Sequence, residues 1–157
     1  MSEHTIALRW ERGEQVFVDN RYNRHHTIDY DGGFSVPFSS SPSLVRVPLS
    51  DPAAVDPEEA LVSAVASCHM LWFLALAAKA GYRVDSYHDP ASGSMAKNEH
   101  GKLFVARVTL RPQVRFSGDK LPDQAAFDAL HHAAHEECNI AHSVRSEIVF
   151  EGQMLLP

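Results

Sequence analysis

The chain has 157 residues, of which 45% are hydrophobic and 22% charged, and its formal net charge is -6. This balance is typical of one folded domain, here residues 1–157, and excludes a disordered chain. The negative charge excludes a general affinity for nucleic acid, which requires basic surface. The charged N-terminal segment lacks the apolar core of a secretory signal, and only two cysteines are present, so we expect a cytoplasmic protein without a disulfide scaffold.

The N-terminal part of the chain is predicted to form β-strands. Thr5–Glu11 and Gln15–Asp19 each alternate apolar and polar residues across a glycine-containing turn, which predicts a hairpin. A third strand is expected at Arg24–Tyr30. The Ser- and Pro-rich stretch Phe34–Ser43 indicates a loop, and Leu44–Leu49 a further short strand.

The longest apolar stretch, Asp56–Gly81, is predicted to form one long helix. Asp56 suits the N-cap and Pro57 the first helical position, while Gly81 is a C-terminal signal. Ala60–Ala78 holds no charged residue and is long enough to span a membrane. It also contains Ser and His, so we favour a helix buried on most sides and expect no membrane association. Because so short a chain can hardly cover such a helix, we expect a homodimer.

After the long helix, the pattern alternates strands with one more helix. We expect strands at Tyr82–His88 and Met95–Glu99, one long strand with a change of register at Lys102–Phe116, and a last strand at Ser146–Phe150. Asp123–Glu137 is a second amphipathic helix, with Phe127, Leu130 and Ala134 on one face. The order of elements predicts an α+β domain.

The two cysteines are the first candidates for chemistry. Cys68 lies in the middle of the long helix and Cys138 at the end of the second. If they meet in space, they can form and break a disulfide, which is a redox cycle. The alternative is two unrelated buried thiols, because free cysteine often packs as a small apolar residue.

The second helix also carries a histidine-rich segment, HHAAHEECNIAH. His131, His135, Cys138 and His142 recur at spacings of four, three and four, which place them near one helix face as metal ligands would be. Zinc sites rarely take every ligand from one helix, because tetrahedral geometry requires ligands from several directions. We therefore favour a polar helix face and expect no metal or other cofactor.

A reactive thiolate needs a nearby positive charge. Cys68 is roughly 16 Å from the N-terminus of its own helix, so the helix dipole contributes little. Arg21 and Arg24 are the candidate cations, and we favour Arg24, held by the carboxylate of Glu58. Glu58 precedes Cys68 by about 15 Å of helix, so a site that uses both is expected to draw on two subunits or two elements.

Two segments of the chain resemble motifs of the OsmC/Ohr family of thiol-dependent peroxidases. DPEEALVSAVASC (residues 56–68) is similar to the helix that bears the family's first cysteine, and HEECNIAHSV (residues 135–144) is similar to its second cysteine motif. Asn139 stands where family members typically have proline, and NRYNRHHT (residues 20–27) departs from the Gly-rich arginine motif. These departures indicate an outlying subgroup.

The resemblance implies an OsmC-like fold, with antiparallel sheets around the long central helix in an intertwined homodimer. It implies that Cys68 attacks an organic hydroperoxide and becomes a sulfenic acid, and that Cys138 then forms a disulfide with it. A dithiol reductant, in the family often lipoyl-linked, restores the pair. Arg24 and Glu58 complete the implied catalytic set, and Val65, Trp72 and Phe73 are expected to favour alkyl groups. The alternative is a non-catalytic OsmC-like protein that senses redox state or binds a metal or a small ligand.

Overall fold

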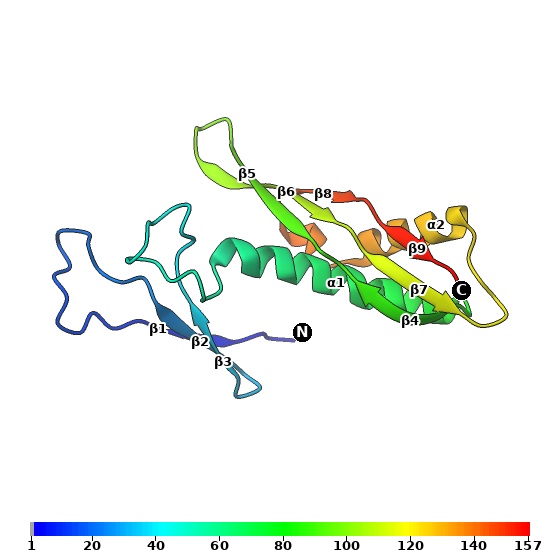
Figure 1. Cartoon of the computed structure of the whole chain (residues 1–157), viewed down its shortest axis with the longest axis horizontal. Coiled ribbons are helices and arrows are strands. Elements are labelled where there is room, and N and C mark those ends of the chain that lie inside the picture. The colour runs from blue at the N-terminus through cyan, green and yellow to red at the C-terminus, as the bar shows by residue number, and fades with distance from the viewer. Residues whose placement is uncertain (1) are drawn as a thin grey trace. The chain divides into compact units, whose positions relative to one another are not determined.

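The computed structural model describes residues 2–157, which form two compact units: the described residues up to 60 (unit 1) and residues 61–157 (unit 2). Figure 1 labels the helices and strands in chain order. Helices and sheets are combined in an α+β fold, which confirms the expected class.

Unit 1 contains a three-stranded antiparallel sheet in the order β1-β2-β3, formed by β1 (Ile6–Arg9), β2 (His26–Tyr30) and β3 (Ser35–Phe38). The strands expected at Thr5–Glu11 and Arg24–Tyr30 are confirmed in shortened form. The expected hairpin is wrong, because β1 pairs with β2, and residues 15–19 form no strand. Val18 is 94% exposed, and Phe17 packs on Tyr22 and Trp10 instead of facing a sheet.

The stretch expected as a loop contains the edge strand β3. Pro37 lies within it opposite Thr27, a position that proline tolerates because an edge strand leaves one row of N–H groups unpaired. The strand expected at Leu44–Leu49 is absent from the described structure, and turns occupy most of that segment. Apolar patterning alone did not reveal that this stretch lacks a partner strand.

Helix α1 (Pro57–Lys79) confirms the predicted long helix. A capping box starts it: the Asp56 carboxylate accepts from the Glu59 backbone N–H (2.8 Å), and the Glu59 carboxylate accepts from the Asp56 N–H (3.1 Å). Gly81, with φ of +80°, ends it in the left-handed conformation typical of C-termini.

Within the chain, α1 buries one stripe of side chains. Val65, His69, Phe73 and Ala77 recur every four residues and are buried, whereas Leu71 is 60% exposed. By length and composition α1 would suffice to cross a membrane, which is weak evidence because the core helix of a soluble protein satisfies the same criteria. Much of its apolar surface therefore has no partner within the described chain.

Unit 2 contains two three-stranded sheets. Their orders are β4-β7-β9 and β5-β6-β8, with the bounds β4 (Arg83–His88), β5 (Ser92–Lys97), β6 (Leu103–Leu110), β7 (Gln113–Ser117), β8 (Glu147–Phe150) and β9 (Gln153–Leu155). β8 and β9 run parallel to β6 and β7, so these sheets are mixed and not purely antiparallel as expected. β9 lies in the C-terminal tail, where the sequence indicated no element.

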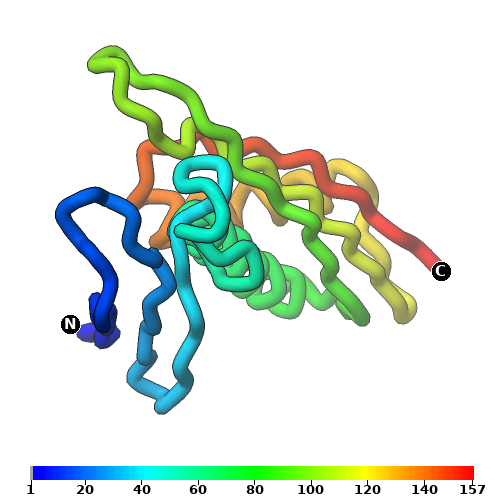
Figure 2. The backbone as a smooth tube through the Cα atoms, turned by 60° about the vertical axis from the view of Figure 1, so that its left-hand side comes forward, coloured from blue at the N-terminus to red at the C-terminus, as the bar shows by residue number. Residues whose placement is uncertain are grey.

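The long strand expected at Lys102–Phe116 is two strands, β6 and β7, interrupted at Arg111–Pro112. Figures 1 and 2 show that β6 continues into β7, and β8 into β9, along nearly unbroken paths. Proline removes a ladder donor at the break. Two hydrogen bonds pair other backbone groups at the break. The Asp89 carboxylate accepts from the Arg111 N–H (2.7 Å), and the Pro112 carbonyl accepts from the Gln153 N–H (2.8 Å).

Helix α2 (Gln124–Glu137) confirms the second predicted helix, and the short 3-10 helix η1 (Ala141–Ser143) follows it. The Asp123 carboxylate caps α2 by accepting from the Ala126 N–H (2.8 Å). The main core of unit 2 packs α1, α2 and β7 together through Phe73, Ala77, Val114, Phe116, Phe127 and Ala134. A second cluster joins α1 to β6 through Val65, Val105, Val108 and Leu110.

Candidate functional site

Cys68 lies on α1 one residue before the buried His69, at the border of the buried stripe. Its side chain is half-buried, and it carries a free thiol. This position lets the sulfur reach a neighbouring element without being enclosed in the core. Helical periodicity produces it, because the next residue along a helix points about 100° away.

Cys138 is the C-cap of α2 and is buried, with 1% of its surface exposed. Its backbone is extended (φ -73°, ψ 106°), the conformation that a following proline would require. Cys138 therefore has the backbone conformation that a proline at position 139 would require, and the helix ends there with Asn139 in place of that proline. The Ser143 hydroxyl donates to the Asn139 carbonyl (2.7 Å), which stabilises the turn.

The structure brings the two thiols together within unit 2. Burial, and then a hydrogen bond with Cys68, raise the pKa of the Cys138 thiol above its ordinary value. The Ala141 backbone N–H also donates to the Cys138 sulfur (3.3 Å), which partly opposes the effect of burial. The two thiols are therefore neighbours in the fold, which is a precondition for a disulfide between them.

A buried imidazole pair also joins α1 and α2. His69 Nε2 and His131 Nδ1 are 2.9 Å apart, and their rings are parallel to within 2°. Burial lowers the pKa of both rings, that of His69 to about 4, so both are neutral at pH 7. In a neutral pair one nitrogen donates and the other accepts. His131 Nε2 is buried without a hydrogen-bond partner among the described residues.

Aromatic rings enclose the His131 side of this pair. The His131 ring centroid lies 4.1 Å from that of Phe73 and 3.8 Å from that of Phe150. Both imidazoles also line a cavity of about 420 Å³. The remaining lining is Leu110, Asp128, His132, His135, Ile148 and Phe150.

The histidine-rich face of α2 does not form the metal site considered from the sequence. His142 Nε2 lies 2.7 Å from the Glu136 carbonyl, Cys138 contacts Cys68, and His131 pairs with His69. Within residues 2–157, no group of three or more His, Cys, Asp or Glu side chains is arranged to hold a metal ion. His131, Cys138 and His142 each contact a different partner instead of facing a common ion.

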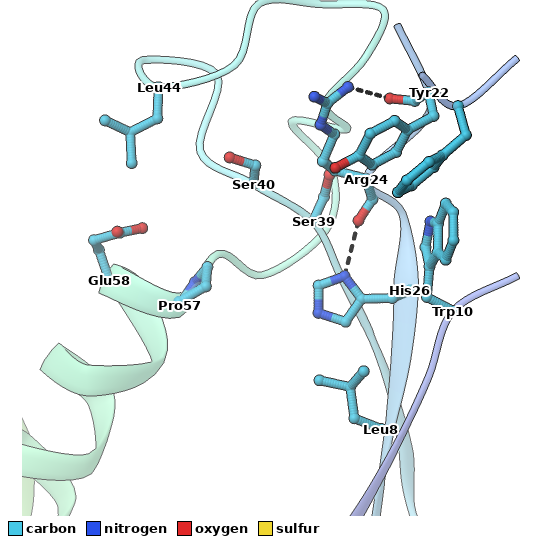
Figure 3. A pocket seen from close by; sticks show the side chains of 11 residues that line it. Leu8, Trp10, Tyr22, Arg24, His26, Ser39, Ser40, Leu44, Pro57 and Glu58 are labelled. Atoms are coloured by element: carbon cyan, nitrogen blue, oxygen red, sulfur yellow. Dashed lines mark hydrogen bonds between the residues drawn. The ribbon is translucent and has the colours of Figure 1, made fainter. Parts of the chain in front are cut away.

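Unit 1 holds the other two expected site residues. Arg24 and Glu58 both line one cavity of about 460 Å³ (Figure 3). The Arg24 backbone N–H donates to the Leu49 carbonyl (2.9 Å), which ties the start of β2 to the loop before α1. Glu58 is in the first turn of α1, where the helix dipole favours a carboxylate.

The expected ion pair between Arg24 and Glu58 is not among the contacts of the described chain. The Arg24 guanidinium lies over the Tyr22 ring (4.0 Å) and donates to the Tyr22 carbonyl and to Asn20 (2.8 Å to Oδ1). Figure 3 shows this bond to Tyr22. Glu58 Oε2 is buried and has no hydrogen-bond partner within residues 2–157. Arg21, the other candidate cation, is exposed and does not line the cavity.

The walls of the unit 1 cavity are largely apolar and aromatic. Trp10, Phe17 and Tyr22 contact one another with ring centroids 4.7–5.8 Å apart, and Leu8, His26 and Leu44 add to the lining. Of the residues expected to favour alkyl groups, Val65 and Phe73 are instead core residues, exposed by 1% or less, and Trp72 packs against the core. The cavity with the aromatic lining is instead the one in unit 1.

Sequence reasoning missed the imidazole pair and the aromatic lining. His69 could have been recognised from its place in the Val65–His69–Phe73–Ala77 stripe, because a histidine in a buried stripe requires a hydrogen-bond partner. The aromatic cluster left no comparable signal in the sequence, because the alternation of Gln15–Asp19 predicted a strand that includes Phe17.

Comparisons with known proteins agree on one family. The family model for OsmC-like proteins matches residues 50–152. An OsmC-like protein of unknown function from Vibrio cholerae is 51% identical, with a TM-score of 0.95, over 98% of this chain and 100% of that one. No curated protein matches.

More distant solved structures share the fold. An organic hydroperoxide resistance protein OsmC from Legionella pneumophila is 12% identical (TM-score 0.65), over 98% of this chain and 97% of that one. OhrB, the organic hydroperoxide resistance protein of Bacillus subtilis, is 16% identical (TM-score 0.61), over 98% of each chain. The family match, the 51% identity and the common fold together establish that this chain belongs to the OsmC/Ohr family.

Proposed function

We propose that the protein is a thiol-dependent peroxidase that reduces organic hydroperoxides to alcohols. The observation that carries the proposal is the contact between Cys68 and Cys138, two thiols 70 residues apart in sequence. Membership of a family that includes proteins named for organic hydroperoxide resistance supports it.

The surroundings of the two thiols support different roles for them. Cys138 is buried, and both burial and its hydrogen bond with Cys68 favour its protonated form. Cys68 is half-buried, so its sulfur is the more accessible of the two. We therefore assign attack on the peroxide to the Cys68 sulfur and resolution to Cys138, because the thiolate is the nucleophile.

The proposed cycle has three steps. The Cys68 thiolate attacks the terminal peroxide oxygen, the O–O bond breaks, and the alcohol leaves with a proton while Cys68 becomes a sulfenic acid. The Cys138 sulfur then attacks the Cys68 sulfur, and water leaves as the disulfide forms. An external dithiol, for which a lipoyl-linked protein is suitable, gives two electrons and two protons and restores both thiols. Such dithiols are available in the cytoplasm, where we place the protein.

We assign Arg24 to stabilising the negative charge that develops on the peroxide, and Glu58 to orienting the guanidinium. The aromatic lining near Arg24 suits the organic group of the substrate, since burying apolar surface is favourable. Ten residues of one helix, about 15 Å, separate Glu58 from Cys68. We therefore propose that the two residues of each site come from different subunits of a homodimer.

The exposed apolar surface of α1 supports the homodimer. The helix buries one stripe within the chain and leaves Leu71 60% exposed. Symmetric pairing of two copies would cover this surface and bury each helix against the other subunit. Glu58 Oε2, which has no partner among the described residues, is consistent with a site that one chain does not complete.

A thiol count by mass spectrometry tests the proposal directly. The reduced protein is treated with one equivalent of cumene hydroperoxide, and the expected product is lighter by two hydrogens, with a peptide that links Cys68 and Cys138. The Cys138→Ser variant is expected to stop at the Cys68 sulfenic acid, which dimedone traps. A wild-type protein that keeps both thiols and leaves the hydroperoxide unconsumed would contradict the proposal.

A second candidate function is small-ligand binding without catalysis, which the aromatic cavity of unit 1 favours. Trp10 lines this cavity, so binding of an apolar ligand would change its fluorescence. If cumyl alcohol quenches Trp10 with micromolar affinity in a protein that consumes no hydroperoxide, binding is the function.

A further inference from the structure

We propose that His69 and His131 are positioning residues that hold the Cys68 and Cys138 sulfurs at the distance a disulfide requires. The inference rests on the proposed redox cycle of the two thiols, and it assigns a purpose to two buried imidazoles that the cycle does not use. Neither histidine is proposed to touch a substrate.

The first argument is the place of the pair between the helices. His69 follows Cys68 directly on α1, and His131 precedes Cys138 by seven residues on α2. Seven residues are nearly two helical turns, so His131 and Cys138 lie on one face of α2, with the buried Ala134 between them. Each helix therefore presents one thiol and one imidazole to the other.

The second argument is the specificity of the contact. Apolar side chains tolerate sliding, because dispersion and the hydrophobic effect have little directional preference. A buried hydrogen bond of 2.9 Å between nearly coplanar rings fixes both the distance and the rotation of the helices. Phe73 and Phe150 hold His131 on its other sides, so the ring cannot follow a displaced partner.

The third argument is the cost of keeping these imidazoles buried. His69 is 3% exposed and His131 is 2% exposed, and His131 Nε2 has no partner among the described residues. Two apolar side chains would fill the same space without an unsatisfied nitrogen. A polar pair in this position is understandable if it defines a single helix register.

Positioning affects chemistry through the effective concentration of one thiol at the other. Oxidation by glutathione disulfide joins Cys68 to Cys138, reduces one S–S bond of glutathione and transfers the two thiol protons to two glutathione molecules. The equilibrium constant of this exchange measures how well the protein holds its sulfurs together. A displacement of about 1 Å is enough to lower such effective concentrations substantially.

The test measures this equilibrium in redox buffers of reduced and oxidised glutathione. We expect His131→Leu to lower the constant about tenfold, which corresponds to about 30 mV for two electrons. His131→Asn, whose amide replaces Nδ1, is expected to restore it to within about threefold. Phe116→Leu removes core packing without touching either histidine, so it controls for loss of stability.

The outcomes separate this inference from the proposed function. If the wild-type protein forms no Cys68–Cys138 disulfide, the redox cycle and the positioning role both fail. If it forms one and His131→Leu leaves the constant unchanged, or Phe116→Leu lowers it equally, the positioning role alone is overturned. The same holds if His131→Asn is no better than His131→Leu.

A second measurement keeps the inference testable if His131→Leu does not fold. Imidazole ¹⁵N shifts of the wild-type protein report the bond between His69 Nε2 and His131 Nδ1. We expect the same hydrogen-bonded pair in the reduced and the disulfide form. Loss of the bond on oxidation would overturn the inference, because a pair that positions the sulfurs must persist in both forms.

Discussion

The thiol contact in unit 2 and the Arg24 cavity in unit 1 differ in how complete they are within one chain. The Cys138 thiol has a hydrogen-bond partner in Cys68 and a backbone donor in Ala141. The cavity holds the Arg24 guanidinium, which is bound to its own loop, and a Glu58 carboxylate oxygen that has no partner in the described part of the chain. One chain thus brings the two thiols together, whereas the arginine and the carboxylate of its cavity make no contact with each other among the described residues.

In the proposed cycle, this difference assigns the two regions to different steps. Disulfide formation needs only the sulfurs and whatever positions them, so it belongs to unit 2. The role proposed for Arg24, stabilising a developing negative charge, needs a free guanidinium, so Arg24 would have to exchange its present partners to perform it. Changes in the two regions should therefore be separable by experiment.

The largest effect is expected from Cys68→Ser, because a serine hydroxyl is a far weaker nucleophile than a thiolate. Consumption of cumene hydroperoxide should fall by at least about 10³-fold, measured by peroxide assay with a dithiol reductant. Cys138→Ser is the matched control and should still consume about one equivalent per chain. Full turnover by Cys68→Ser would show that peroxide reduction does not depend on the thiol pair.

A large effect on stability is expected from acidification, because two neutral imidazoles are buried in unit 2. Their folded pKa values lie below the unfolded value of 6.5, so the unfolded chain binds more protons between pH 6.5 and the folded pKa, about 4 for His69. Stability should therefore fall with decreasing pH in this window. Each imidazole contributes about 1.4 kcal/mol per pH unit, which amounts to a few kcal/mol between pH 7 and pH 5.

Urea unfolding at pH 7, 6 and 5 measures this loss. The double variant His69→Leu/His131→Phe should lose most of the acid sensitivity. It leaves the other titratable groups at the same cavity unchanged, which are Asp128, His132 and His135. His25→Ala, an exposed imidazole of unit 1, should keep it. A wild-type stability that does not change between pH 7 and pH 5 would show that the pair is not neutral.

Predictions from the sequence were more successful for the helices of unit 2 than for the strands of unit 1. α1, α2 and the placement of Cys68 and Cys138 on them were predicted, because caps and periodicity are local signals. The meeting of the thiols and the His69–His131 pair depends on how two distant helices cross, which no local pattern encodes. In unit 1 the alternation of Gln15–Asp19 predicted a strand that would pair with the first one. Strand pairing depends on tertiary contacts, and β1 pairs with β2 instead.

A smaller effect is expected from Arg24→Ala. It should lower kcat/KM for cumene hydroperoxide about 10- to 100-fold through lost charge stabilisation, and Arg24→Lys should recover only part because lysine lacks the planar fork. Arg21→Ala, an exposed neighbour that does not line the cavity, should stay within about twofold of wild type. The glutathione equilibrium of the thiol pair should be unchanged in all three variants. A shift in that equilibrium would contradict the separation of the two regions.

The smallest effect concerns the start of α1, the helix that carries both Glu58 and Cys68. Asp56→Ala removes the acceptor of the Glu59 N–H and should destabilise the protein by about 1 kcal/mol in urea unfolding. Fraying of the first turn would displace Glu58 but leave Cys68, three turns further along, in place. We therefore expect a few-fold loss of peroxidase rate with an unchanged thiol–disulfide equilibrium. Glu59→Gln, which preserves the capping box, should change neither, and an equal loss of both quantities in Asp56→Ala would mean that the two regions are not independent.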